Sequence, residues 1–142
     1  MKRLIYYVLQ FTWNLLTNIL GLITFLVLVL TRHEVKMFGP NIVTIVGKSW
    51  GGLSLGIFIF TGENSKNNFR LLAHEFGHSL QGLILGPLWL FLVGIPSSIR
   101  YNYRNIVSNK KQLPPYDSIW FEGTATKYGL KYAQVDWLNK GV

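Results

Sequence analysis

Residues 71–80 read LLAHEFGHSL and place two histidines and a glutamate inside an apolar run. The chain has only 3 histidines and 6 acidic residues among its 142 positions, so this stretch concentrates side chains that are scarce elsewhere. The polar loop TGENSKNN precedes it, and Asn67 or Asn68 is suited to cap a helix running from about residue 69 to residue 83. The sequence therefore predicts that the polar triplet lies on one largely apolar helix.

The spacing of the triplet is typical of a metal site. His74 and His78 are about 6 Å apart along the helix axis and about 40° apart around it, so both imidazoles can reach one ion. Zinc accepts two such nitrogen ligands. Glu75 is rotated by about 100° from His74, which places its carboxylate beside the ion as a general base. The H-E-x-x-H pattern thus predicts two zinc ligands and a general base.

A catalytic zinc site usually has a third protein ligand. We expect this ligand to be Glu122, because it lies in an apolar stretch compatible with a helix and a buried carboxylate needs a partner. The alternative is a surface carboxylate paired with Lys127 or Lys131. The remaining candidates outside the motif are His33, Glu34, Glu63, Asp117 and Asp136.

Composition favours contact with a membrane. Charged residues make up only 14% of the chain and hydrophobic residues 49%, whereas soluble domains carry about 25% charged residues. The net charge of +8 comes from basic residues scattered singly or in pairs, without a basic block or an RNA-binding motif. We therefore expect a lipid membrane with an anionic surface as the partner and no nucleic acid.

The longest apolar tract covers residues 4–30 and is long enough to span a bilayer as one helix. Its polar positions 10, 14, 17 and 18 fall on one helical face, which predicts packing against a partner helix or the rest of the domain. A cleaved signal peptide is the competing interpretation, but LVLTRHEV offers no small-residue cleavage site. The charges around the tract leave the orientation open.

The remaining chain predicts a small α+β domain. Residues 42–46 and 53–60 are strand-like and are expected to form a hairpin, while residues 97–116 are expected to be an exposed connection. A final helix is expected at about residues 117–131, carrying Glu122. We therefore divide the chain into an N-terminal hydrophobic helix, residues 1–36, and a minimal zinc-peptidase-like domain, residues 37–142.

HEFGH, followed after 43 intervening residues by a glutamate in a helical context, resembles the gluzincin class of zinc metallopeptidases. From about residue 10 to residue 130 the chain is more closely similar to small bacterial membrane-associated proteins related to that class. The patterns GxSLGxFIF, HEFGHSLQ, ILGPLWL and GIPS carry this similarity. The resemblance implies His74, His78 and Glu122 as ligands, Glu75 as base, and a location at the bacterial inner membrane. It also implies that residues 53–60 form the rim of a substrate cleft.

Two further roles follow from comparison with that class. Gluzincins often carry an aspartate four residues after the third ligand, where this chain has Thr126. Thr126 or Asp117 is a candidate for orienting a ligand histidine. Tyr116 or Tyr128 is a candidate for donating a hydrogen bond to a substrate carbonyl oxygen.

The favoured hypothesis is a zinc metallopeptidase that cuts a peptide or protein substrate at or in a membrane, with Zn²⁺ activating a water and Glu75 accepting its proton. One alternative is a non-catalytic membrane-associated protein in which a metal only ties two helices together. Another is a small basic membrane-binding or regulatory protein without a metal.

Overall fold

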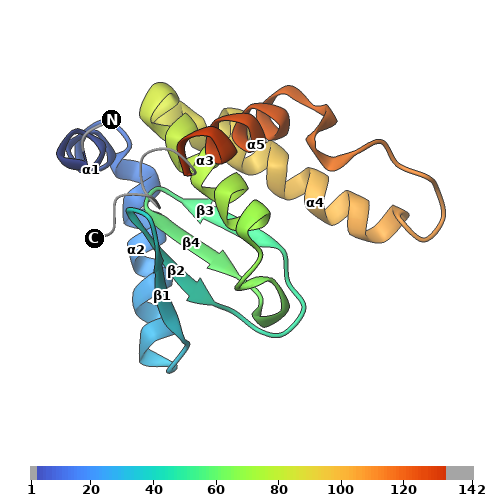
Figure 1. Ribbon diagram of the computed structural model, residues 1–142, viewed down its shortest axis with the longest axis horizontal. Coiled ribbons are helices and arrows are strands. Elements are labelled where there is room, and N and C mark those ends of the chain that lie inside the picture. Colours follow the sequence, from blue (N-terminus) through green and yellow to red (C-terminus); the bar gives the residue numbers. More distant parts are fainter. Residues whose placement is uncertain (1–2, 134–142) are drawn as a thin grey trace.

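A four-stranded sheet lies among helices drawn from both ends of the chain (Figure 1). The computed structural model describes residues 3–133, and it confirms the predicted α+β class. The strands are β1 (Val35–Phe38), β2 (Asn41–Ile45), β3 (Gly52–Leu55) and β4 (Phe58–Thr61). The α-helices are α1 (Arg3–Thr12), α2 (Leu15–Leu30), α3 (Phe69–Leu85), α4 (Ile95–Val107) and α5 (Trp120–Tyr132). Short helical turns are η1 (Glu63–Ser65), η2 (Gly86–Leu88), η3 (Leu90–Gly94) and η4 (Tyr116–Ser118).

The strand order of the sheet is β1-β2-β4-β3, which differs from the predicted pairing. Residues 53–60 are two strands rather than one, because the chain turns at Gly56, where φ is +65°. The hairpins are β1 with β2 and β3 with β4, whereas β2 and β4 run parallel. The expected hairpin between residues 42–46 and 53–60 was therefore wrong, and β3 becomes a terminal strand.

Helices α2 and α3 cover opposite faces of the sheet. The hydroxyl of Ser54 on β3 lies 2.9 Å from the hydroxyl of Ser79 on α3. The next residue, Leu55, lies against Gly21 of α2. Successive residues of a strand point to opposite faces, so the sheet is enclosed between these two helices. β4 is buried along its whole length as a result.

The N-terminal tract is two helices, and the predicted single helix over residues 4–30 was wrong. α1 and α2 meet at an angle of 92°, at a break next to Asn14. Asn18 Nδ2 donates to the backbone oxygens of Gln10 and Asn14, and Asn14 Nδ2 donates to Gln10 Oε1. These polar side chains are buried, which confirms the prediction that they pack against the protein. The proposed division of the chain at residue 36 stays a prediction.

Within residues 3–133 no single helix is long and apolar enough to cross a bilayer. Two consecutive pairs have sufficient combined length and apolar composition, and both pairs are sharply bent. They are Arg3–Thr12 with Leu15–Leu30, bent by 92°, and Phe69–Leu88 with Leu90–Val107, bent by 119°.

Residues 97–116 were expected to be an exposed connection, but most of them belong to α4. Pro96 lies in the first turn of α4, where its missing N–H costs no helix hydrogen bond. The apolar segment before it, η3, has π-helical geometry. The predicted final helix is confirmed as α5, and the motif helix is confirmed as α3, capped by Asn68, whose side chain accepts from Leu71 N at 3.1 Å.

The central contact of the fold is the close packing of α3 against α5. A methyl group on Gly77 of α3 would lie 1.9 Å from the carbonyl oxygen of Ala125 on α5. A methyl group on Gly129 of α5 would lie 1.8 Å from the carbonyl oxygen of Ala73. Two glycines therefore allow the two backbones to touch, and no larger residue fits without moving one helix.

We expect Gly77→Ala to lower the free energy of unfolding by about 1–3 kcal/mol, because the new methyl group forces the helices apart. Alanine normally stabilises a helix by about 1 kcal/mol relative to glycine, so the sign of the change reports the packing. Denaturant unfolding measures it, with Lys127→Ala at an exposed position of α5 as control. A more stable Gly77→Ala protein would contradict the proposed contact.

Candidate metal centre

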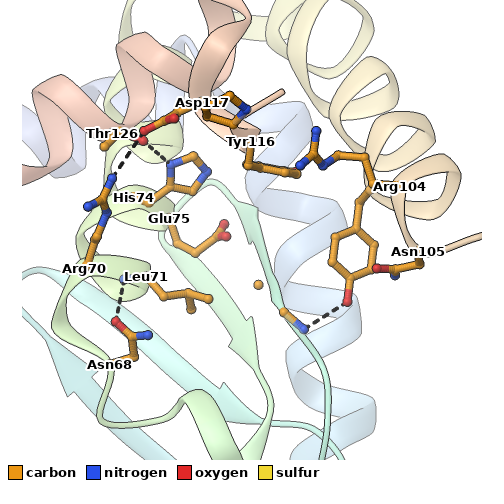
Figure 2. Close-up of a pocket in the computed structure, with 14 residues that line it drawn as sticks. Asn68, Arg70, Leu71, His74, Glu75, Arg104, Asn105, Tyr116, Asp117 and Thr126 are labelled. Carbon is orange, nitrogen blue, oxygen red and sulfur yellow. Dashed lines mark hydrogen bonds and ion pairs between the residues drawn. The ribbon is translucent and has the colours of Figure 1, made fainter. Parts of the chain in front are cut away.

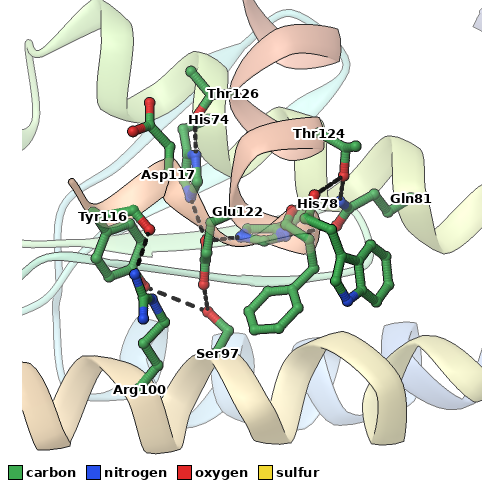
Figure 3. A network of polar contacts seen from close by, with 12 residues as sticks. His74, His78, Gln81, Ser97, Arg100, Tyr116, Asp117, Glu122, Thr124 and Thr126 are labelled. Atoms are coloured by element: carbon green, nitrogen blue, oxygen red, sulfur yellow. Dashed lines mark hydrogen bonds and ion pairs between the residues drawn. The ribbon is translucent and has the colours of Figure 1, made fainter. Parts of the chain in front are cut away.

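The packing of α3 and α5 brings three potential metal ligands together (Figure 3). His74 and His78 come from α3 and Glu122 comes from α5. Glu122 Oε2 lies 3.1 Å from His74 Nε2 and 3.2 Å from His78 Nε2. One ligand atom from each residue lies within 4.8 Å of the other two. The three residues selected from the sequence as ligands therefore form one cluster.

The donor set fits a divalent ion such as zinc. Two imidazole nitrogens and one carboxylate oxygen are ligands that catalytic zinc sites use. Zinc ligands at about 2.0–2.1 Å in tetrahedral geometry are about 3.3 Å apart, close to the two separations between Glu122 Oε2 and the imidazole nitrogens. The cluster therefore can hold a metal ion with little rearrangement.

Both histidines are oriented by a hydrogen bond to the ring nitrogen that faces away from Glu122. His78 Nδ1 lies 2.8 Å from Gln81 Oε1. The Gln81 amide donates to Phe121 O and to the Thr124 hydroxyl, so its oxygen faces the imidazole as an acceptor. His78 Nδ1 thus carries a proton, and Nε2 faces Glu122. Nε2 donates to that carboxylate when it is also protonated and can bind a metal when it is not.

His74 has an equivalent partner. Its Nδ1 lies 2.8 Å from the hydroxyl of Thr126, one of the two residues considered for this role. The other, Asp117, forms an ion pair with Arg70 at 3.3 Å instead. Hydroxyl contact at Nδ1 leaves His74 Nε2 directed toward Glu122, as metal ligation requires.

Glu122 is fully buried and remains ionised because of its neighbours. Burial raises the pKa of its carboxyl group, but hydrogen bonds from His74, His78 and Ser97 outweigh burial and hold the pKa well below its usual value. Ser97 on α4 donates to Oε1 at 2.5 Å, which leaves Oε2 for the histidines. The carboxylate is therefore a fixed anion directed at the cluster.

Glu75 lies beside the cluster and reaches the wall of a cleft (Figure 2). A methyl group on Gly52 of β3 would lie 2.2 Å from Glu75 Oε1, so the carboxylate lies directly against the strand backbone. Burial raises the pKa of Glu75, and the nearby charge of Glu122 raises it further. His78 and His74 lower this pKa and so partly offset the two effects. A carboxylate with a raised pKa is suited to accept a proton near neutral pH.

Two connected cavities reach this carboxylate. The larger, of about 540 Å³, contacts His74 and Glu75, and the smaller, of about 130 Å³, contacts Glu75 and His78. Tyr116 lines both cavities, and burial raises the pKa of its hydroxyl to about 12, so the group stays protonated. Tyr128, the other tyrosine considered as a donor, lines a separate cavity with Leu80 and Ile84.

The other sequence candidates for the third ligand lie elsewhere. The ring of His33 contacts the Thr31 hydroxyl and Leu28 O. Glu34 and Glu63 both pair with Lys66, at 3.1 and 2.6 Å. Asp136 is outside the described residues.

Sequence reasoning missed two residues of this site. Gln81 lies three positions after His78, on the same helical face, so its spacing within α3 was an available signal. Ser97 lies on α4, and its contact with Glu122 depends on a helix that the sequence reading did not expect. Long-range packing, rather than local pattern, brings Ser97 to the site.

No family model, no curated protein and no solved structure matches this chain. The support for a metal centre is the geometry of His74, His78 and Glu122. Hydrogen bonds with Thr126, Gln81 and Ser97 orient the three side chains, and two cavities give access to the neighbouring Glu75.

We expect Thr126→Val, which removes the hydroxyl at His74 with little change of shape, to weaken metal binding about tenfold to a hundredfold. Competition with a chromogenic chelator measures the affinity. Thr24→Val is the matched control, because the Thr24 hydroxyl donates only to Leu20 O of its own helix. Equal affinities in the two variants would show that Thr126 does not orient His74.

Proposed function

We propose that this protein is a zinc-dependent peptide hydrolase that acts at a membrane surface. The observation that carries the proposal is the convergence of His74, His78 and Glu122 beside the buried carboxylate of Glu75. The arrangement resembles the gluzincin class, in which the H-E-x-x-H helix supplies two ligands and a later helix supplies a glutamate. Zinc as the metal and hydrolysis as the reaction are both parts of the proposal.

The chain's own residues have defined roles in this mechanism. A zinc ion held by His74, His78 and Glu122 would supply Lewis acidity toward water and a substrate carbonyl group. Glu75 accepts a proton from the attacking water and delivers it to the nitrogen of the leaving amine. Tyr116 lies near the site, and its hydroxyl group donates a hydrogen bond to the substrate carbonyl oxygen.

Access to the site favours catalysis over a purely structural metal. A structural zinc site is closed by four protein ligands, whereas the described residues bring three together. Both cavities next to the cluster contact Glu75, which is not among the three ligand residues. A carboxylate that is buried, close to the cluster and reachable from a cleft has a chemical role in hydrolysis but none in metal retention.

The membrane part of the proposal rests on α2. This helix has no charged residue, and it exposes a series of large apolar side chains, among them Ile19, Ile23 and Val27. Its 16 residues are about 24 Å long, shorter than the roughly 30 Å hydrocarbon core, so α2 suits a position along the membrane interface rather than across the bilayer. Anionic lipid also complements the net charge of +8.

The central test is Glu75→Gln in metal-loaded protein. We expect it to keep one bound zinc, because Glu75 is not a ligand, and to reduce peptide cleavage at least a hundredfold, because the general base is lost. Metal analysis and a fluorogenic peptide library measure the two properties. Glu63→Gln, at an exposed carboxylate paired with Lys66, is the matched control.

A complementary variant distinguishes the role of the metal ligand from that of the general base. Glu122→Gln removes the anionic ligand, and we expect it to lose both zinc and cleavage. Full turnover in Glu75→Gln would refute the general base. Stoichiometric zinc in Glu122→Gln would refute the third ligand.

Membrane binding is tested with the double variant Ile23→Glu and Val27→Glu. Both positions are 56% exposed, so we expect a folded protein whose binding to vesicles of phosphatidylethanolamine and phosphatidylglycerol falls at least tenfold. The control is Lys127→Glu, at an exposed position of α5, which lowers the net charge by two units as the double variant does. Vesicle flotation measures binding. An equal loss of binding in the double variant and in Lys127→Glu would attribute the effect to net charge and contradict the role of α2.

A further inference from the structure

We propose that an apolar groove between β3 and α4 holds an apolar segment of the polypeptide substrate and leads it to Glu75. The inference rests on the proposed hydrolase function and specifies its substrate class. The groove has a volume of about 600 Å³. Leu53 and Leu55 form its wall on β3, and Ile95, Ile99 and Ile106 form its wall on α4.

The groove adjoins the candidate active site. Leu53, Gly94, Ser98 and Asn102 line both this groove and the smaller cavity that contacts Glu75 and His78. A chain lying in the groove therefore passes along the end of the sheet, at its terminal strand β3, to the carboxylate. This shared wall favours a substrate over an unrelated partner as the occupant.

The exposed face of α4 explains why the bound segment is apolar. Ile95, Ile99 and Ile106 are 46%, 64% and 72% exposed, and none of the residues of α4 is fully buried. The opposite, polar side of the helix makes the contacts within the protein, through Ser97 to Glu122 and Arg100 to the backbone of Tyr116. The apolar stripe therefore does not serve the core, and it is available to a ligand.

Polar side chains lie where the groove meets the smaller cavity. Ser98 and Asn102 are exposed and line both spaces. A peptide backbone offers N–H and C=O groups to such side chains, whereas a lipid acyl chain has none. A polypeptide with apolar side chains therefore suits both the apolar wall and these polar groups.

The groove opens on the side of the sheet that carries α2. Leu55 is shared by the groove and by the contact with Gly21 of α2. The helix proposed to enter the membrane thus lies next to the groove. A substrate whose apolar segment lies at the membrane surface reaches Glu75 without first crossing water.

The test is photocrosslinking in Glu75→Gln protein, reconstituted in lipid nanodiscs, with a photoreactive phenylalanine in place of Ile99. Two fluorescent 12-residue peptides are added, one rich in Leu and Ile and one with Ser and Gln at those positions. We expect at least tenfold more labelling by the apolar peptide. The same residue in place of Val27 on α2 is the control for partitioning into lipid, and there we expect no saturable labelling.

Groove variants then identify the contact. We expect Ile95→Gln with Ile106→Gln to raise the half-saturating concentration of the apolar peptide at least tenfold, equivalent to about 1.4 kcal/mol. Met37→Gln, at an exposed apolar position of β1 outside both the groove and α2, leaves it unchanged. Equal labelling by the two peptides, no effect of the groove variants, or labelling of phospholipid that the peptide does not displace would each overturn the proposal.

The outcomes distinguish this inference from the proposed function, because the Glu75→Gln protein reports binding without hydrolysis. Saturable labelling in the groove, combined with no cleavage by the wild-type protein, would support the groove and overturn the hydrolase. The opposite outcome is that the wild-type protein cleaves peptide and the groove variants equal it in binding and turnover. This result would support the hydrolase and overturn the proposed role of the groove.

Discussion

The backbone contact between α3 and α5 determines whether the candidate site exists. Gly77 and Gly129 let the helices approach until a glycine of each lies against a carbonyl oxygen of the other. Glu122 is one turn before Ala125, so this approach sets the distance from its carboxylate to both imidazoles. The surrounding hydrogen bonds with Ser97, Thr126 and Gln81 refine an arrangement that helix packing makes possible.

The parts of the structure that depend on local pattern were predictable. The motif helix, its Asn68 cap and the helix of Glu122 follow from short-range rules of spacing and capping. The buried polar face of residues 10–18 also followed from helical spacing. The choice of Glu122 among the acidic residues needed one further argument, that an ionised carboxylate among core residues requires a partner.

The predictions that were wrong concern features that depend on tertiary contacts. At the break between α1 and α2, the buried side chain of Asn18 donates to the backbone oxygens of Gln10 and Asn14, although the apolar pattern on both sides is continuous. The parallel pairing of β2 with β4 depends on a turn at Gly56 inside a run that reads as one strand. α4 was missed because its isoleucines are diluted by polar and basic residues, and nothing in the core requires them.

The three potential ligands are separated unevenly along the chain, and this has a consequence for biosynthesis. The two imidazoles lie within five consecutive residues, but the carboxylate follows the second of them by 44 positions. A nascent polypeptide released as far as α4 has both nitrogen donors and no third ligand. Assembly of the centre therefore waits for the last described helix to leave the ribosome and dock, so an incomplete translation product carries only a partial, weakly binding pair.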